Sequence, residues 1–489
     1  RRARTPSSRA DRAGDTTGAG VMTFDGVLLA LVLACTGYLV LLYSLYFSLM
    51  VLGHVESRRR RRERSVDDPD ALAASRFAPG VSIIVPAYNE SGGLPHAVRS
   101  LLALDYPEFE VIVVNDGSTD DTLDVLVGAL ELVAVDAASR DVVPGQPVEG
   151  YYRSLDPRLL VVDKANGGKA DALNVGLNHC RYRYVCGVDA DMVFAPTALT
   201  RAMREISGDP EHIVGLTSYF ENARDPVRVL ENGLQAAGPD TRPLFAFQTF
   251  DYLRSFFNNR TPWARLNFML CAAGAFQLWR RDLVEDIGGW SAEFTCEDIE
   301  FTFRVHRTLR ERGRAYRIAC LPDCVGVTEG PDNVKNLVSQ RERWQRVVLE
   351  TCWANRRMWF NPRYGSVGLL GVPYYLVSEI LAPVFEAVAI GTLLAGGVAG
   401  LIDWWQFAVL TLLITFANSA LTTGALLNLD LEAGAYRASG VARLLGLMPL
   451  EMVVYRPIMA WARLKGTWRF LRGDRAWHKF ERNVKAGAA

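Results

Sequence analysis

Hydrophobic and polar positions divide the chain into three parts. Residues 26–53 are almost entirely apolar, and so is much of the chain beyond about residue 366, whereas the middle has the mixed pattern of a soluble domain. A run of about 20 apolar residues is long enough to cross the hydrocarbon core of a bilayer. The pattern therefore predicts a membrane helix, then a globular domain, then a second membrane region.

Within the globular part, short apolar runs alternate with stretches of helical spacing. Each run is followed by polar residues or glycine, as expected where a buried parallel strand ends. We therefore predict an α/β domain with a mostly parallel sheet and functional residues at the carboxyl ends of its strands. The runs interpreted as strands are residues 81–85, 111–114, 159–162 and 184–188.

The charges beside the first apolar segment predict its orientation. Five arginines at positions 58–62 and a sixth at position 64 follow it directly. Basic residues next to a span stay in the cytoplasm, which predicts a cytosolic globular domain on a bacterial inner or plasma membrane. A cleaved signal peptide would be shorter, with its positive charge on the other side. Residues 1–21 are rich in Arg, Ser and Gly, so we expect disorder there, with Met22 as a candidate start.

The second membrane region is harder to count. Apolar segments near 372–394 and 405–427 predict spans, while 441–461 is interrupted by prolines and charges and either spans or lies in the interface. Residues 344–359 combine aromatic and basic side chains, which favours a helix in the membrane interface. The expected organisation is a disordered extension (1–21), a transmembrane helix (22–54), a basic cytosolic linker (55–77), the α/β domain (78–335), an amphipathic interface region (336–365), a C-terminal transmembrane region (366–462) and a basic cytosolic tail (463–489).

Composition adds two expectations. The 54 Lys and Arg residues balance the 54 Asp and Glu residues, so no nucleic acid partner is expected. The eight cysteines are scattered and do not form zinc-ligand pairs, which favours free thiols in a reducing compartment.

Polar residues follow all four predicted strands. Each is a weak signal by itself, because aspartate is common in turns and at helix caps. In the order of the strands they predict one shared site, containing Tyr88 and Glu90, then Asp116, then Lys169, and then Asp189 with Asp191.

These residue types suit a nucleoside diphosphate sugar. Asp189 and Asp191 can hold Mg²⁺ or Mn²⁺ against its phosphates, which neutralises the charge of the leaving group. Lys169 follows two glycines that permit close approach and can bind a phosphate. Asp116 can accept the imide N–H of uracil, and Tyr88 can stack on the ring.

The acceptor hydroxyl needs a base, and a second group of residues can supply it. Glu297 and Asp298 lie where a loop enters a predicted helix, so Asp298 is either the base or a helix cap. Further along, Arg343 can pair with the diphosphate and Trp344 offers a flat face to an acceptor sugar. The alternative for Arg343 and Trp344 is a membrane-anchoring pair.

From about residue 81 to 344, the order of these motifs resembles the processive family 2 inverting glycosyltransferases, which include cellulose, chitin, hyaluronan and poly-N-acetylglucosamine synthases. The resemblance implies a GT-A nucleotide-sugar-binding domain. Cys296 stands where threonine is usual. The resemblance assigns uridine binding to Asp116, the metal to Asp189 and Asp191, the base to Asp298, the Gln-x-x-Arg-Trp motif to Gln340, Arg343 and Trp344, and the acceptor-binding end to Gly274 and Phe276.

The function so implied is inverting transfer from a UDP-sugar, dependent on Mg²⁺ or Mn²⁺, to build a β-linked polysaccharide, with coupling to its export as a further expectation. Its partners would be the donor, a glycan or glycolipid acceptor, and the bilayer. The alternative is a non-processive enzyme that adds one sugar to a lipid carrier or glycolipid. The few spans make a pore within one chain hard to build, which favours this alternative or a homo-oligomer.

Two further points stay open. Glu379 and Glu386 lie seven residues apart on one face of a predicted span, where they either line a glycan conduit or pair with another helix, for example through Arg456. A transporter or scaffold with a degenerate nucleotide fold would have lost polar motif residues, and all are present. The donor sugar and the linkage are not encoded in any motif.

Overall fold

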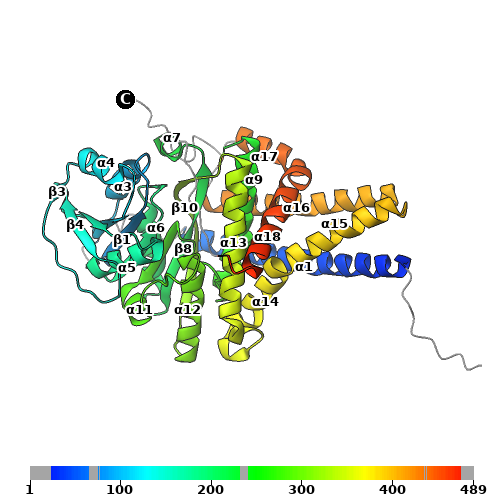
Figure 1. Ribbon diagram of the computed structural model, residues 1–489, viewed down its shortest axis with the longest axis horizontal. Coiled ribbons are helices and arrows are strands. Elements are labelled where there is room, and N and C mark those ends of the chain that lie inside the picture. The colour runs from blue at the N-terminus through cyan, green and yellow to red at the C-terminus, as the bar shows by residue number, and fades with distance from the viewer. Residues whose placement is uncertain are drawn as a thin grey trace, which may run out of the picture.

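The computed structural model describes residues 24–64, 75, 78–231, 240–433, 436 and 438–474. The extension at 1–21, which is expected to be disordered, and the end of the basic tail lie outside these residues. A sheet domain forms one side of the molecule, and long helices extend from the other side (Figure 1).

The centre of the sheet consists of the strands expected from the sequence. They are adjacent in the order β5-β2-β1-β6, and every pair is parallel. Their side chains are almost completely buried, which explains their continuous apolar runs. These strands are β1 (Val81–Ala87), β2 (Phe109–Asp116), β5 (Leu159–Lys164) and β6 (Tyr184–Val188).

The outer strands make the ten-stranded sheet mixed, so the expectation of a mostly parallel sheet holds for its centre and for the pair of β8 and β10. β9 runs antiparallel between β6 and β8, while β4 and β7 run antiparallel to β5 and β10. The chain reaches β8, β9 and β10 only after helical segments, and no local pattern reveals which strand each of them joins. They are β3 (Val133–Ala134), β4 (Val148–Arg153), β7 (Met192–Phe194), β8 (Ile213–Ala223), β9 (Phe276–Arg280) and β10 (Arg317–Glu329).

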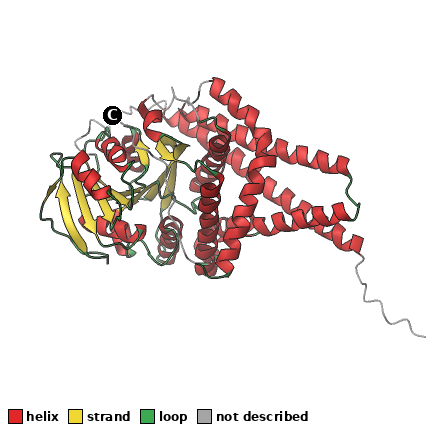
Figure 2. Ribbon diagram, turned by 45° about the horizontal axis from the view of Figure 1, so that its top comes forward, coloured by secondary structure: helices red, strands yellow, loops and turns green. Residues whose placement is uncertain are grey.

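Helices cover the sheet (Figure 2). α5 (Lys169–His179) packs so closely on it that a Cβ at Gly176 would lie 2.3 Å from Ile84 Cγ2. The glycine thus brings the start of α5 down onto the strand ends. The other helices of this domain are α3 (Leu94–Leu102), α4 (Thr122–Ala129), α6 (Ala198–Gly208), α7 (Pro226–Glu231), α9 (Pro243–Leu253), the π-helix η1 (Arg254–Arg260), α10 (Thr261–Arg265), α11 (Arg281–Asp286) and α12 (Glu297–Glu311).

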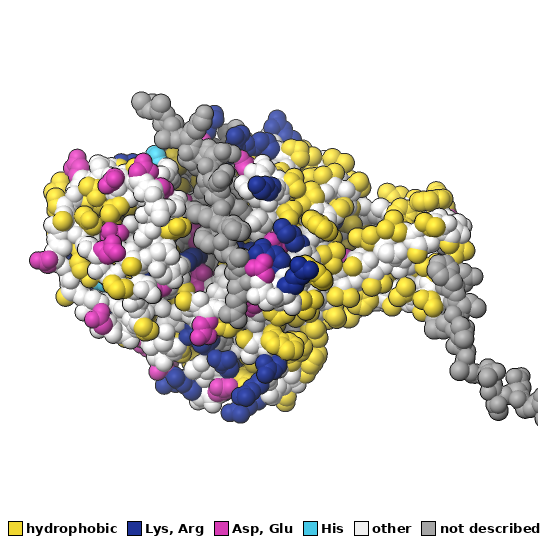
Figure 3. All heavy atoms as spheres, viewed as in Figure 1, with side chains coloured by type: hydrophobic (Ala, Val, Ile, Leu, Met, Phe, Trp, Pro, Cys, Tyr) yellow, Lys and Arg dark blue, Asp and Glu magenta, His cyan; other side chains and the backbone are white. Residues whose placement is uncertain are grey.

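Three long helices form an apolar lobe: α1 (Phe24–Arg64), α15 (Ala382–Val398) and α16 (Trp404–Ala433). They lie side by side and point away from the sheet (Figure 1). Apolar side chains cover the visible face of the lobe, whereas Lys and Arg gather near its base (Figure 3). α1 continues through the arginine cluster, where Arg59 and Arg60 pair with glutamates one turn away. The linker expected at 55–77 therefore begins as helix.

Further helices join the two parts. α18 packs along α13. The chain enters the apolar lobe where η5 ends and α15 begins. Among the residues that the structure describes, four helical segments are long and apolar enough to cross a membrane by length and composition: Gly26–Glu63, Val367–Val398, Trp404–Leu429 and Ala438–Leu471. The joining elements are α13 (Val334–Ala354), η2 (Arg356–Met358), η3 (Pro362–Tyr364), η4 (Val367–Gly371), α14 (Val372–Tyr375), η5 (Leu376–Ile380), α17 (Ala438–Leu450), η6 (Glu451–Tyr455) and α18 (Arg456–Leu471).

Candidate active site

A cavity of about 1210 Å³ begins at the carboxyl ends of the central strands and continues between the helices of the apolar lobe. Its volume exceeds the few hundred to about 1,000 Å³ that one small ligand usually occupies. It can therefore hold two ligands in contact. The residues expected from the sequence that line it are Tyr88, Glu90, Asp116, Lys169, Asp189, Asp191, Gly274, Glu297, Asp298, Gln340, Arg343 and Trp344.

Phe276 is the exception and corrects the sequence-based expectation. It begins β9, is only 2% exposed and packs against Phe194 in the core. Its backbone carbonyl accepts a bond from Thr217 Oγ1 instead of facing the cavity. Phe276 therefore supports the floor of the site and does not contact an acceptor.

One end of the cavity, which we call the carboxylate-rich half, lies at the strand ends and includes Glu90, Asp116, Asp189, Asp191 and Lys169. The Asp116 carboxylate accepts bonds from the buried Lys164 ammonium and from the backbone N–H groups of Gly167 and Gly168, at 2.9 and 2.8 Å. It thereby shapes the turn that begins α5 and aims Lys169 into the cavity.

Lys169 links the strand ends to the loop before α12. Its Nζ lies 2.7 Å from Asp189 Oδ1 and 2.7 Å from Glu297 Oε1. Burial disfavours its charge, but Asp189, Glu297 and Asp298 together raise the pKa of Lys169 well above its ordinary value. The ammonium therefore stays charged and holds these carboxylates close together.

Asp298 lies beside this group without being a helix cap. Cys296 occupies the N-cap position of α12 and makes no side-chain capping bond, so the capping alternative is wrong. Asp298 Oδ2 accepts a 3.0 Å bond from Gly274 N, and Oδ1 accepts a 2.7 Å bond from Ile299 N. Burial and the neighbouring Glu297 raise the pKa of Asp298, against the opposing effect of Lys169. A carboxylate with a raised pKa is a stronger base.

Gly274 makes this geometry possible. A Cβ there would lie 2.8 Å from Lys169 Nζ and 3.2 Å from Glu297 Oε1. Any other residue would push these groups away while its backbone N–H still had to bond Asp298. The resemblance assigned Gly274 to the acceptor-binding end. The contacts show in addition that the missing side chain of Gly274 leaves room for three charged groups to lie close together.

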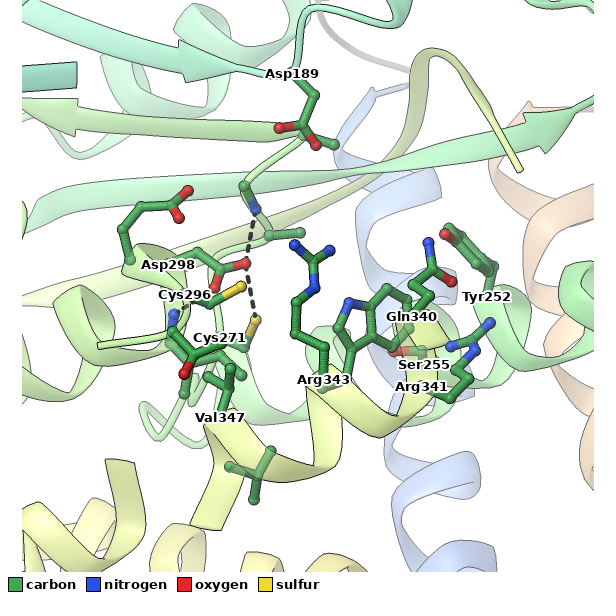
Figure 4. A pocket seen from close by; sticks show the side chains of 18 of the residues that line it. Asp189, Tyr252, Ser255, Cys271, Cys296, Asp298, Gln340, Arg341, Arg343 and Val347 are labelled. Atoms are coloured by element: carbon green, nitrogen blue, oxygen red, sulfur yellow. Dashed lines mark hydrogen bonds between the residues drawn. The ribbon is translucent and has the colours of Figure 1, made fainter. Parts of the chain in front are cut away.

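α13 brings its motif residues to the cavity opposite Asp298. Gln340, Arg343 and Trp344 of this helix line the cavity. Arg343 lies between Gln340 and Asp298 (Figure 4). Thr295 is bonded to Glu350 of the same helix through its Oγ1 at 2.9 Å, which ties the loop before Asp298 to α13. The loop that carries Asp298 and the motif helix are therefore held together.

The other end of the cavity, which we call the arginine-rich half, is lined by Arg254, Arg260, Arg341, Arg456 and Arg463. Arg254 Nη2 is 2.6 Å from Glu451 Oε1 and 2.9 Å from Asp251 Oδ1. Arg456 also pairs with Glu451, at 2.9 Å. These ion pairs offset the cost of burying the charges of Arg254, Arg456 and Glu451.

The two glutamates of the predicted span also form ion pairs. Arg463 Nη2 lies 3.0 Å from Glu379 Oε2, and its Nη1 lies 3.6 Å from Glu386 Oε1. Pairing with another helix is thus observed, but the partner is Arg463 and not Arg456. Glu379 and Arg463 line the cavity as well, so this pairing is compatible with a polar path.

Asp189 and Asp191 fit a divalent cation. Two carboxylates one residue apart offer the hard oxygen ligands that Mg²⁺ and Mn²⁺ prefer. No cluster of three or more metal-ligating side chains occurs among the residues that the structure describes. A cation at this pair would therefore take its other ligands from phosphate oxygens and water, as Mg²⁺ often does.

The cavity residues that the sequence reasoning did not identify include Tyr252, Arg260 and Arg341. Tyr252 and Arg260 belong to α9 and η1, which lie in no recognisable motif. Arg341 stands at a variable position inside the Gln-x-x-Arg-Trp motif, and its guanidinium lies 4.1 Å from the centre of the Trp344 ring. The sequence signal that could have identified Arg341 is its position three residues before Trp344 on one predicted helix, because side chains at this spacing are neighbours.

Comparison with known proteins agrees with this geometry. Residues 82–130 and 128–288 match the family model described as glycosyl transferase family 2. A poly-beta-1,6-N-acetyl-D-glucosamine synthase of Staphylococcus epidermidis is 24% identical over 278 residues, which are 56% of this chain and 57% of that protein. The same-named enzyme of Staphylococcus aureus is 24% identical over 266 residues, 54% and 53% of the two chains. The chain thus spans about half the length of the curated relatives it matches.

A solved structure extends the likeness to the fold. A mannosyltransferase from Pyrobaculum calidifontis, in complex with GDP-Man and Mn²⁺, shares 19% identity at a TM-score of 0.50 and covers 80% of this chain and 98% of its own. Together with the family match and the strand-end site, this shows a GT-A-like domain. Residues 82–288 of this chain, which carry the strand-end site, are thus similar to the domain of family 2 glycosyltransferases.

Proposed function

We propose that the protein is a membrane-bound inverting glycosyltransferase that uses a UDP-sugar to build a β-linked polysaccharide. The names of the relatives make UDP-N-acetylglucosamine the first donor to test. One observation carries the proposal: Asp298 is held by Gly274 N between the Lys169–Asp189 pair and the motif helix α13.

The donor would lie in the carboxylate-rich half. Tyr88 and Asp116 would contact uridine, and Lys169 and Arg343 would bind the diphosphate. Asp189 and Asp191 would hold Mg²⁺ or Mn²⁺, which supplies positive charge opposite the phosphates. Glu90 lines the same end and would complete the donor pocket.

The acceptor would approach from the other side of Asp298. Its hydroxyl loses a proton to Asp298 as its oxygen bonds to the anomeric carbon, and the bond from that carbon to UDP breaks with both electrons leaving on the diphosphate. A single displacement inverts the anomeric centre, so an α-linked donor gives a β-linked product. Trp344 would stack on the acceptor sugar, with Gln340 beside it, and Glu297 would hold Lys169 in place.

The membrane arrangement follows from the helices. We infer that α1 enters toward the cytosol, α15 leaves and α16 returns, so that the sheet domain, α17 and α18 share the cytosolic side. The basic residues near the base of the lobe support this orientation. Under this proposal the segment 441–461 lies against the domain, and oligomerisation would supply any wider export path.

The test is turnover by the purified full-length protein in lipid nanodiscs. Radiolabelled UDP-N-acetylglucosamine, UDP-glucose and UDP-glucuronate are each supplied with Mg²⁺ or Mn²⁺, and the products are sized. A labelled polymer from one donor supports the proposal. A lipid carrying a single sugar supports the non-processive alternative, which the short membrane region favours, and hydrolysis or no turnover with every donor contradicts both.

A further inference from the structure

The cavity contains more positive charge on its membrane side than its own carboxylates neutralise. Five arginines line the arginine-rich half, whereas the carboxylates paired with them are Asp251, Glu379, Glu386 and Glu451. The carboxylate-rich half has the opposite imbalance, with Lys169 and Arg343 among many acids. The excess in the arginine-rich half is concentrated in Arg260 and Arg341.

Arg260 is a guanidinium without an acidic partner. Its Nε donates a 3.1 Å bond to the Cys271 carbonyl, its Nη1 donates to Ser255 Oγ, and its plane stacks on Phe256. Among the described residues no carboxylate lies within ion-pair distance of it. Arg260 is the last residue of the π-helix η1. Such helices often occur at functional sites.

Arg341 is also incompletely satisfied. Its side chain is only 7% exposed, and its Nε and Nη2 have no hydrogen-bond partner among the residues that the structure describes. The nearest carboxylate oxygen, Asp251 Oδ2, is 3.9 Å from Nη2. A buried guanidinium with unused N–H groups is costly, and an oxyanion that accepts these bonds removes the cost.

Both arginines lie away from the expected diphosphate site. Arg260 is linked to Asp298 through Cys271, whose Sγ lies 3.5 Å from Arg260 Nη2 and 4.0 Å from Asp298 Oδ2. Lys169, at the expected diphosphate site, pairs instead with Asp189. Arg341 lies next to Tyr252 and farther from Asp298 than Arg343 does (Figure 4), with its guanidinium 5.9 Å from the centre of the Tyr252 ring. Both arginines act on Tyr252, where they oppose the effect of burial, which raises the pKa of its phenol. The two guanidinium groups thus face the space left for the acceptor.

We propose that the acceptor receiving the first sugar is a lipid-linked glycan and that Arg260 and Arg341 bind the phosphate of its lipid linkage. Guanidinium groups bind phosphate oxygens through paired N–H donors. The cavity continues from these arginines to Tyr46, Leu421 and Met459 of α1, α16 and α18, which offer an apolar path for the lipid chain. This inference rests on the proposed transfer reaction and applies to single addition and to polymer growth from a lipid primer.

The experiment measures binding without turnover, so its outcome is independent of the donor assay. Full-length protein in nanodiscs of neutral phosphatidylcholine is titrated with farnesyl phosphate, farnesol and inorganic phosphate, and UDP affinity is measured in parallel. We expect farnesyl phosphate to bind at least about 10-fold more tightly than farnesol or inorganic phosphate, because farnesol lacks the charge that guanidinium groups bind and inorganic phosphate lacks the lipid chain. Farnesol binding as tightly as farnesyl phosphate overturns the phosphate site, and inorganic phosphate binding as tightly overturns the lipid source.

Variants tie the binding to the two arginines. Arg260→Gln and Arg341→Gln should each weaken farnesyl phosphate at least about 10-fold and leave UDP affinity within about twofold, whereas Arg260→Lys should lose less. Arg153→Gln is the matched control, because Arg153 lies on β4 and its Nη1 donates only a 3.4 Å bond to the Pro157 carbonyl. Unchanged farnesyl phosphate affinity in both Gln variants, with UDP binding intact, overturns the proposal. Loss of UDP binding in a Gln variant shifts the comparison to the Lys variants, where equal affinity to the unchanged protein also overturns it.

Discussion

The two halves of the cavity are built from different parts of the molecule and have opposite charge. The carboxylate-rich half is formed by strand ends of the sheet, where backbone geometry places Asp116, Lys169 and Asp189 within a few residues of a buried strand. The arginine-rich half is formed by helices, and its charges meet across distant segments, as Arg254 and Glu451 do. A strand end positions its residues locally, whereas a helix cluster positions them only after the chain has packed.

The difference suggests separate roles. The acidic residues would hold a cation, which would supply positive charge to the diphosphate, and the basic residues would attract an acceptor with negative charge. Asp298 lies at the boundary, which is where a base between donor and acceptor is needed. Variants on either side should therefore fail in distinguishable ways.

The largest effect is expected at the boundary. Asp298→Asn should lower kcat about 10³-fold, within the range for losing a general base, while UDP affinity stays within about twofold. Sugar transfer and UDP binding are measured on the same preparation. Asp124→Asn on the exposed face of α4 is the control. Near-normal transfer by Asp298→Asn would show that another group is the base.

A large effect is also expected in the carboxylate-rich half. Asp191→Asn should weaken UDP binding in the presence of Mn²⁺ about 100-fold and change metal-free UDP binding little, because it removes a carboxylate that is proposed to hold the cation. Calorimetric titration of UDP with and without Mn²⁺ separates the two states. Equal losses in both states would mean that Asp191 contributes to folding of the site and not to the metal.

A moderate effect is expected where the halves meet at Gly274. Gly274→Ala should lower kcat about 10- to 100-fold, because its Cβ would displace Lys169 and Glu297 by a fraction of an ångström or more. Gly208→Ala, at the end of α6, is the matched control because nothing lies within 4 Å of its Cβ. If kcat is unchanged while the control behaves normally, the Lys169–Glu297 geometry is not needed for transfer.

The smallest effect is a shift in pH dependence. Because burial and Glu297 raise the pKa of Asp298, kcat/KM should fall with decreasing pH as the carboxylate gains a proton, at a pH above the ordinary pKa of an aspartate. Glu297→Gln removes a negative charge beside Asp298, so the acidic limb should move to lower pH. The profile is measured at saturating Mn²⁺. Movement to higher pH would contradict the electrostatic account.

Sequence and structure contributed unequally to the two halves. Motifs at the strand ends gave the residues of the carboxylate-rich half, because in a parallel sheet consecutive carboxyl ends lie at one edge. Asp298 was open between base and cap, and the N-cap position of Cys296 removed the second alternative. Phe276 was misjudged, because its motif lies at a strand start whose side chain turns into the core.

By itself the sequence determined the central strands, the order of the polar motifs, the apolar segments and the charge beside the first of them. All of these are local properties, set by side-chain period, turn chemistry and charge within one stretch of chain. The tertiary structure alone decided the antiparallel outer strands, the pairing of Glu379 with Arg463, and the gathering of Arg260 and Arg341 beside Asp298. These depend on contacts between segments tens to hundreds of residues apart, and a local pattern does not specify which distant segments pack together.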